Sequence, residues 1–254
     1  MRLEFITLVV KTAKKASIVI INDNSPAPGL KNTWGWSAYI ELDNIAILFD
    51  ANSNPEIIEY NMKKLNIDTD KIEFGVLSHA HADHYGGFRY IGRIKPGLRV
   101  YIPLRRAVFL REWGLEPILV EQPLRLSSDV WISDPIKSYP IFGIAEIALG
   151  IRVDGVGLVV VVGCSHPGVD RISQRLAEIT NERIFIVIGG YHNPTQKSLD
   201  KLAGITKYIC PAHCSGDRAK RYVKNTYPEK YVEIRTGTTL IVDETGELRL
   251  QNYP

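Results

Sequence analysis

All six histidines of this 254-residue chain lie in four short segments whose composition suits metal binding. One segment, His79-Ala80-His81-Ala82-Asp83-His84, contains three of them. The other three stand singly in turns flanked by glycine or cysteine: His166, His192 and His213. Imidazole is the commonest protein ligand for zinc and related ions. Because every histidine lies in such a segment, we predict that the chain is organised around metal.

The run 79–84 places four ligand side chains within six residues. The imidazoles of His79 and His81, at i and i+2, can hold one ion from a tight loop, whereas Asp83 and His84 come from the turn beyond and can face a second. Zinc takes about four ligands, one of them water in a catalytic site. The run therefore predicts two adjacent divalent ions, zinc in the first place, with manganese or iron as alternatives. A solvated loop rich in His and Asp is the weaker interpretation.

Each of the four segments follows a predicted strand. These strands are expected over residues 72–77, 157–162, 184–188 and 208–210. In layered α/β proteins the loops at strand ends carry the chemistry. The four segments are therefore expected to meet at one site.

The remaining elements alternate along the chain. Further strands are predicted over 2–11, 16–22, 37–42, 45–49, 230–234, 237–242 and 246–251, and helices over 54–65, 169–180, 195–203 and 216–225. Asn54-Pro55-Glu56 has an N-cap residue followed by proline at the first helical position. The segment 103–145 is irregular and rich in proline, which predicts a variable region that covers the substrate.

Composition narrows the class of protein. The chain is 45% hydrophobic and 23% charged, as in ordinary globular proteins. It has no run of about 18 apolar residues, and its N-terminus does not resemble a signal peptide, so neither a membrane span nor export is expected and the cytoplasm is the predicted location. Three cysteines, Cys164, Cys210 and Cys214, cannot all pair within the chain; reduced thiols near a metal fit better than a disulfide framework.

The net charge of +3 is too small to indicate a nucleic-acid partner. One local excess of positive charge lies between Arg89 and Arg111, where the chain has no acidic residue. A solvated basic face is the ordinary meaning of such a segment. The alternative is a rim that attracts an anionic substrate, such as a phosphorylated one.

The run 79–84, followed by Gly86-Gly87, resembles the signature of the metallo-β-lactamase superfamily, and the resemblance extends over nearly the whole chain. Asp50, at the end of a strand, matches the first motif of that superfamily, and His213 matches its late histidine. The resemblance implies a four-layer αββα sandwich: two mixed β-sheets face to face, helices outside, and a dinuclear site at one edge. A single domain spanning 1–254 is expected.

The resemblance also implies which residues bind each metal. His79 and His81 would bind the first ion, and Asp83, His84 and His213 the second. Most members have a further histidine after the run, and His166 is carried over in that role.

One departure from the superfamily pattern concerns Cys164, which stands where the bridging aspartate is expected. Two interpretations stay open for this residue: a thiolate ligand, or a small buried hydrophobic side chain.

Several shorter motifs resemble one branch of the superfamily, named for dihydropterin-methyl-ribofuranosylaminobenzene phosphate synthase. They are Asn22-Asp23-Asn24, Gly35-Trp36-Ser37 and the segments 163–168, 189–192 and 211–216. The pattern is specific to the branch and much less so to that reaction.

The leading hypothesis is a metal-dependent, hydrolytic enzyme that uses metal-activated water on a small anionic substrate. Asp83 would orient the nucleophile and pass a proton, and His192 would act as general acid. For His192, a hydrogen-bonded core position, a contact with substrate, and ligation in place of His166 are the alternatives.

Three other functions stay open. The branch name implies condensation of a pterin diphosphate with an aromatic ribosyl phosphate, with release of diphosphate; Trp34, Trp36, Trp113 and Trp131 are candidates to stack on the pterin. A closed coordination shell would indicate a non-catalytic metal-binding module. Nuclease activity is disfavoured because the basic segment lacks interleaved aromatic residues, so no nucleic-acid partner is expected.

Overall fold

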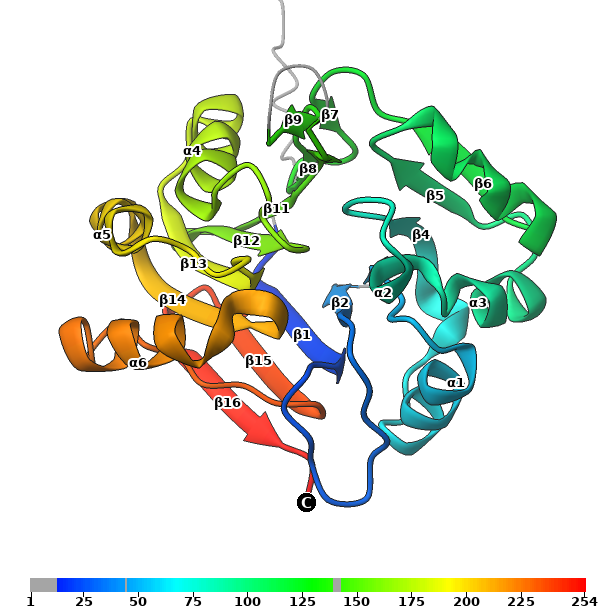
Figure 1. Cartoon of the computed structure of the whole chain (residues 1–254), viewed down its shortest axis with the longest axis horizontal. Helices are drawn as coiled ribbons and strands as arrows, with labels where there is room; N and C mark the ends of the chain where they lie inside the picture. Colours follow the sequence, from blue (N-terminus) through cyan, green and yellow to red (C-terminus); the bar gives the residue numbers. More distant parts are fainter. Residues whose placement is uncertain (1–12, 44, 139–142) are drawn as a thin grey trace, which may run out of the picture.

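Two β-sheets packed face to face form the centre of the molecule (Figure 1). The computed structural model describes residues 13–43, 45–138 and 143–254. The larger sheet contains β1 (Lys15–Asn22), β2 (Ser37–Leu42), β3 (Ile45–Phe49), β4 (Ile72–Val76), β5 (Arg99–Ile102), β6 (Glu116–Leu119), β15 (Thr238–Asp243) and β16 (Leu248–Asn252). The smaller contains β7 (Leu124–Arg125), β8 (Val130–Ile132), β11 (Leu149–Val153), β12 (Gly157–Val162), β13 (Ile184–Gly190) and β14 (Thr206–Ala212).

Both sheets are mixed. The strand order is β16-β15-β1-β2-β3-β4-β5-β6 in the larger sheet and β14-β13-β12-β11-β8-β7 in the smaller. The pairs β3–β4, β4–β5 and β5–β6 are parallel, as are β12–β13 and β13–β14. Parallel neighbours end at the same edge of a sheet, so the loops after them lie together. A separate two-stranded ladder joins β9 (Ile136–Lys137) and β10 (Ala145–Glu146).

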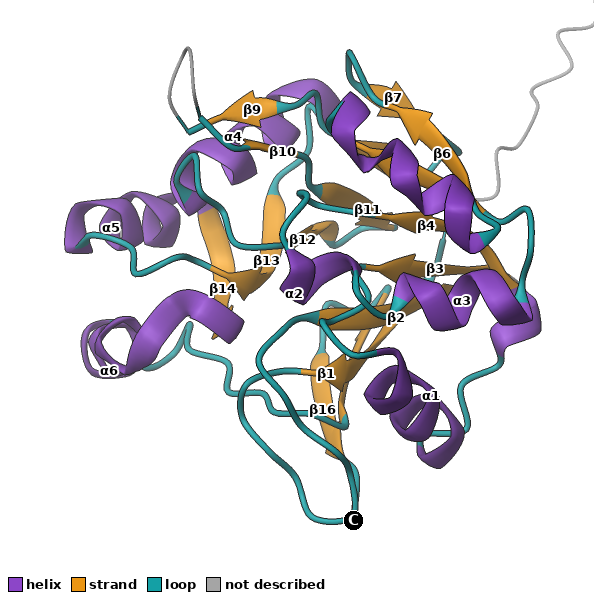
Figure 2. Ribbon diagram, turned by 45° about the vertical axis from the view of Figure 1, so that its right-hand side comes forward, coloured by secondary structure: helices purple, strands orange, loops and turns teal. Residues whose placement is uncertain are grey.

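Helices cover the outer faces of both sheets (Figure 2). The α-helices are α1 (Pro55–Lys64), α2 (Ala82–Tyr85), α3 (Phe88–Ile94), α4 (Val169–Thr180), α5 (Gln196–Ile205) and α6 (Gly216–Thr226). Three 3₁₀ segments are η1 (Thr69–Lys71), η2 (Arg105–Trp113) and η3 (His213–Ser215). Side chains from α1, α3 and η2 pack on the larger sheet, and side chains from α4, α5 and α6 pack on the smaller.

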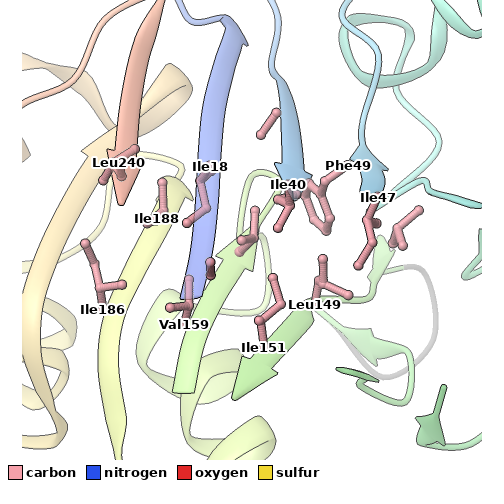
Figure 3. Close-up of a cluster of buried hydrophobic side chains, with 14 of the residues drawn as sticks. Ile18, Ile40, Ile47, Phe49, Leu149, Ile151, Val159, Ile186, Ile188 and Leu240 are labelled. Carbon is pink, nitrogen blue, oxygen red and sulfur yellow. The ribbon is translucent and has the colours of Figure 1, made fainter. Parts of the chain in front are cut away.

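Alternating side chains of the strands separate the inner core from the two outer ones. In β3, Ile47 and Phe49 point into the space between the sheets, while Leu48 packs against the helices. In β12, Val159 points inward and Val160 outward. Figure 3 shows these inner side chains of both sheets meeting in one cluster. The four-layer αββα sandwich that the resemblance implies is therefore confirmed.

Local signals in the sequence correspond to observed boundaries. Asn54 caps α1, its side-chain oxygen accepting a hydrogen bond from the backbone N–H of Glu56 at 2.8 Å. Thr195 caps α5 through the N–H of Ser198 at 3.2 Å. The predicted strands 37–42 and 45–49 are present as β2 and β3, which pair antiparallel. The predicted strand 2–11 lies outside the described residues, and so does Asn44 in the turn between β2 and β3.

Two expectations differ from the structure. Residues 230–234 form no strand: only Tyr231 makes a bridge, to Ile209, because this segment passes the edge of β14 once before the chain crosses to β15. The segment 103–145 is more regular than expected, because β6 extends the larger sheet and β7 and β8 extend the smaller. Pro117 is accommodated because β6 is an edge strand. Among the described helices, none is long and apolar enough to cross a membrane.

Candidate functional site

The four histidine-bearing segments meet at the carboxyl ends of parallel strands. The run 79–84 follows β4 in the larger sheet, and the loops of the other three histidines follow β12, β13 and β14 in the smaller. The centre of the His79 ring lies 4.1 Å from that of His84 and 4.7 Å from that of His166. His213 lies 5.0 Å from His84, and His192 lies 4.3 Å from His166. All six imidazoles thus belong to one cluster.

Two glycines allow α2 to hold its ligands in place. A Cβ atom on Gly86 would lie 2.0 Å from the carbonyl oxygen of Ser53, and one on Gly87 would lie 2.0 Å from that of Ala51. Only glycine permits this close approach of α2 to the loop after β3. The Gly-Gly pair after the run is therefore explained by backbone packing.

The candidate ligands fall into two neighbouring trios. His79, His81 and His166 form the first trio; Asp83, His84 and His213 form the second. Within each trio the candidate donor atoms all lie within 4.8 Å of one another. The six side chains singled out from the sequence are therefore brought together, in the same division as the resemblance implies.

Buried carboxylates orient two of the imidazoles from behind. Asp50, at the end of β3, accepts hydrogen bonds from the backbone N–H and the hydroxyl of Ser78, both at 2.7 Å. Its Oδ2 atom also lies 2.7 Å from Nδ1 of His84, which leaves Nε2 of His84 to face the cluster. Burial raises the pKa of Asp50, although the contact with His84 opposes this effect.

Glu146 has the corresponding role in the smaller sheet, and sequence reasoning missed it. Its Oε1 accepts from the backbone N–H groups of Cys164 at 2.8 Å and Ser165 at 2.7 Å. Its Oε2 accepts from the N–H of His166 at 2.9 Å and lies 3.0 Å from Nδ1 of that ring. Burial opposes ionisation, but these hydrogen bonds outweigh it and lower the pKa of Glu146. Because Glu146 is a single acidic residue outside any motif, nothing in the local sequence indicates that it orients His166.

His213 depends on the early Asn22-Asp23-Asn24 motif. Its backbone N–H donates to Asp23 at 2.5 Å, and its Nδ1 lies 3.2 Å from Oδ1 of Asn24. Its backbone has a φ of 46°, a left-handed conformation that is costly for a residue with a side chain. Its Nε2 is buried and has no hydrogen-bond partner among the described residues, although Oδ2 of Asp83 lies 3.3 Å away.

Asp83 is the carboxylate at the open side of the second trio. Its Oδ2 accepts a hydrogen bond from Nε1 of Trp34 at 2.9 Å and lies 3.6 Å from Nε2 of His84. Partial burial would raise the pKa of Asp83, but the neighbouring rings of His213 and His84 outweigh this effect and lower it. Trp34 itself is 59% exposed and lies beside the His213 ring.

The other three tryptophans do not share that position. Trp36 and Trp131 are buried in the fold, whereas Trp113 lines a cavity on another side of α2. Trp34 is thus the tryptophan that contacts the histidine cluster directly.

Two cysteines complete the cluster. The Sγ atom of Cys164 lies 3.2 Å from Nε2 of His84 and 3.2 Å from Sγ of Cys214. Hydrogen bonding with Cys164 and with His192 lowers the pKa of Cys214, whereas the hydrogen bond with Cys214 and burial raise the pKa of Cys164. Cys210 is buried in the core between the sheets and takes no part.

His192 lies at the rim of the first trio. Its backbone φ is 46°, and its side chain is exposed, so a core position is excluded. Its ring nitrogen can lie within ligand distance of donors on Cys164 and His166. The contact with Cys214 raises the pKa of His192.

A cavity of about 400 Å³ adjoins the other face of α2. Ala82, Tyr85 and Gly86 of that helix line it together with Phe109 and Trp113 of η2. Arg89, from the basic segment, also lines this cavity and stacks 4.7 Å from the Trp113 ring centre. A larger cavity, of about 590 Å³, lies at the opposite ends of β13 and β14 and is remote from the histidines.

The donor chemistry fits a pair of divalent cations. Burial lowers the pKa of His79 well below its ordinary value, so its ring is neutral, as ligation requires. The buried Nε2 of His213 makes no hydrogen bond with the described residues and lies 3.3 Å from Oδ2 of Asp83, so a cation between the two would satisfy both. Nitrogen, oxygen and sulfur donors within one cluster are the ligands that zinc takes in proteins.

Comparisons with known proteins agree with this architecture. No protein-family model matches the chain. The chain is 26% identical to the 7,8-dihydropterin-6-methyl-4-(beta-D-ribofuranosyl)-aminobenzene-5'-phosphate synthase of Methanocaldococcus jannaschii, over 80% of this chain and 88% of that protein. It is 27% identical to an uncharacterised protein of the same organism, over 80% of this chain and 91% of the other.

Among solved structures, a metal-dependent hydrolase of the β-lactamase superfamily superposes with a TM-score of 0.74 at 24% identity, covering 90% of this chain and 99% of that one. A metallo-β-lactamase fold protein from Bacillus subtilis gives a TM-score of 0.60 at 14% identity, covering 88% and 98%. The chain therefore has the metallo-β-lactamase fold, and the resemblance drawn from the sequence is confirmed.

Proposed function

We propose that this protein is an enzyme that hydrolyses a small anionic substrate at a centre of two divalent cations. The observation that carries the proposal is the pair of neighbouring trios, each with three candidate donor side chains. Adjacent pairs of divalent ions recur in phosphatases, nucleases and aminopeptidases, where they activate water and stabilise the reacting oxygens. Two trios side by side therefore favour catalysis over a closed metal-binding module.

The first trio would hold one cation and the second trio the other, with zinc expected and manganese or iron as alternatives. Bound divalent ions make a nearby water acidic enough to supply hydroxide near neutral pH, and they stabilise negative charge that develops on a phosphoryl or carbonyl oxygen. His81, His166 and Asp83 are partly exposed, which opens the cluster to a substrate on that side.

Two residues would move protons or orient the reactants. Asp83, held by the indole N–H of Trp34, has a free oxygen that would orient the attacking water. His192, exposed at the rim, would protonate the leaving group as general acid. Its left-handed backbone keeps the ring beside His166 instead of in the core.

An anionic substrate is the best match to the surroundings of the site. The first trio has no carboxylate of its own, and Arg89 lines the cavity on the other face of α2 together with one acidic residue, Glu112. The guanidinium of Arg89 stacks on Trp113 and keeps its donors available. Arg89 would attract a phosphorylated or otherwise anionic part of the substrate into that cavity, while the reacting group lies at the trios.

A second candidate is a synthase reaction, in which a pterin diphosphate condenses with an aromatic ribosyl phosphate and diphosphate leaves. The similarity to the Methanocaldococcus jannaschii synthase over most of both chains favours it. So does the aromatic lining of the cavity by Tyr85, Phe109 and Trp113, which suits a flat ring. Release of diphosphate from the two substrates mixed together, and from neither alone, would favour the synthase over hydrolysis.

The test of the proposed enzyme pairs metal analysis with activity. The purified protein is assayed for metal content and screened against phosphodiesters, lactones and thioesters. His81→Ala should lose one cation and essentially all activity, because a trio is left with two donors. Full activity of a metal-free His81→Ala protein would overturn the proposal.

His192→Gln is the matched variant at the same cluster. It should retain both cations and lose about 10²- to 10⁴-fold in turnover, as expected for removal of a general acid. Loss of a cation from this variant would instead assign His192 as a ligand.

A further inference from the structure

The thiol of Cys164 lies within the cluster but belongs to neither trio. It lies in the loop after β12, where its backbone N–H is held by Glu146. Its Sγ points at Nε2 of His84, 3.2 Å away, the nitrogen that Asp50 leaves free on that ring. The thiol is therefore directed into the cluster by contacts on both sides.

This sulfur lies within reach of donors from both trios. It groups with His79 of the first trio and His84 of the second at once, and in two separate groupings with His166 of the first trio and with His213 of the second. In each grouping the donor atoms lie within 4.8 Å of one another. A single donor atom in such a place is shared between the two trios.

The charge of the cluster also favours an anionic donor shared between the two trios. The two trios together contain five imidazoles and one carboxylate, Asp83. The other buried carboxylates nearby, Asp50 and Glu146, are already engaged with His84 and His166 from behind. Two divalent cations would thus meet one negative charge, and an anion between them would offset their mutual repulsion.

We propose that Cys164 ligates both cations through its sulfur, as a bridging thiolate. This inference rests on the proposed two-cation centre. When the cations bind, the thiol proton is released to solvent, since only the thiolate is a metal ligand. Cys214 lies 3.2 Å from that sulfur and acts as its hydrogen-bond partner. A thiolate bridge makes the centre select zinc or cobalt over manganese.

The geometry of the loops explains why sulfur is accommodated there. A Cβ atom on Gly190 would lie 2.7 Å from Sγ of Cys214, and one on Gly163 would lie 2.0 Å from Oγ of Ser78. Gly163, before Cys164, therefore leaves the space that the Ser78 hydroxyl occupies, and Gly190, at the end of β13, leaves the space of the Cys214 sulfur.

X-ray absorption of the zinc-loaded wild-type protein tests the bridge without any variant. A sulfur shell at about 2.3 Å should appear beside nitrogen and oxygen at about 2.0–2.1 Å. It should average one sulfur for each zinc, as a bridge requires, whereas a terminal thiolate would give half of that. Two bound zinc ions with no sulfur shell would overturn the inference and leave the proposed function standing. A protein that binds no metal would overturn both.

Cobalt substitution then assigns the sulfur. The cobalt-loaded protein should show a sulfur-to-cobalt charge-transfer band, and Cys164→Ser should lose it. Cys164→Asp should lose the band yet keep two cations, with a shift of preference from zinc toward manganese, because a carboxylate replaces the thiolate. Cys214→Ser should keep the band, and so should Cys210→Ser, the control in the buried core. A band that survives Cys164→Ser and disappears in Cys214→Ser would overturn the assignment.

Discussion

Each imidazole at the centre of the cluster is oriented by a polar side chain on its far side. Asp50 holds His84, Glu146 holds His166, and Asn24 holds His213. Such outer partners fix which nitrogen faces a metal and raise its basicity, and their loss typically costs 10- to 100-fold in metal affinity. Glu146 makes the most contacts of the three, because it also accepts hydrogen bonds from the backbone N–H groups of Cys164 and Ser165.

Glu146→Gln should therefore weaken binding at the first trio by about 10- to 100-fold. It should also lower the free energy of unfolding by about 1–3 kcal/mol, because the amide cannot satisfy four donors as the carboxylate does. Competition with a chelator measures the first effect, and urea unfolding measures the second. Glu178→Gln, at an exposed position of α4, is the control and should change neither. Wild-type affinity in the Glu146 variant would refute the role.

At the scale of elements, strand ends set the positions of the ligands. Parallel strands β12, β13 and β14 finish at one edge, and a residue in left-handed conformation follows each of the last two: His192 after β13 and His213 after β14. Gly190 closes β13 where a side chain has no room. Each strand brings the chain to the edge of the cluster, and the left-handed residue after it turns the imidazole ring toward the other ligands.

Gly190→Ala should disturb this junction, because the added methyl would meet the carbonyl oxygen of Gly163 at 2.5 Å as well as the Cys214 sulfur. We expect a loss of about 1–3 kcal/mol in the free energy of unfolding and reduced metal content. Gly204→Ala in α5 is the matched control, since no atom lies within 4 Å of the new Cβ. It should stabilise the protein by about 0.5–1 kcal/mol. Thermal unfolding compares the pair, and equal behaviour of the two variants would contradict the prediction.

At the scale of the whole molecule, the cluster joins the two sheets. The run 79–84 follows the larger sheet, whereas His166 and His213 follow the smaller, so each trio takes ligands from both. Cations bound there would link the two halves of the sandwich. Binding to the folded state alone adds stability by mass action, about 2.7 kcal/mol for each site when free metal is 100 times its Kd.

Removal of metal by a chelator should accordingly lower the unfolding temperature, and return of zinc should restore it. The control is the same chelator already saturated with zinc, which should have no effect. Calorimetry with both samples measures the difference. An unfolding temperature indifferent to metal would show that the cluster does not link the sheets.

Much of the fold and half of the site could be predicted from the sequence, for short-range reasons. The run 79–84 is recognisable because its ligands are neighbours in the chain and need only one tight loop. The cap of α1 at Asn54 and the pairing of β2 with β3 are likewise decided within a few residues. The strands 72–77 and 157–162 are recognisable from the sequence because each is an apolar run just before ligand residues.

Contacts between residues far apart in the chain were decided only by the tertiary structure. The thiols of Cys164 and Cys214 are 50 positions apart and meet only because β12 and β14 flank β13. Glu146 reaches His166 because the two-stranded ladder ends beside the loop after β12. No local pattern encodes these distances, since they depend on how two sheets pack. The sequence by itself determined which side chains can bind metal; the packing of the sheets decided their neighbours and the place of the sulfur between the two trios.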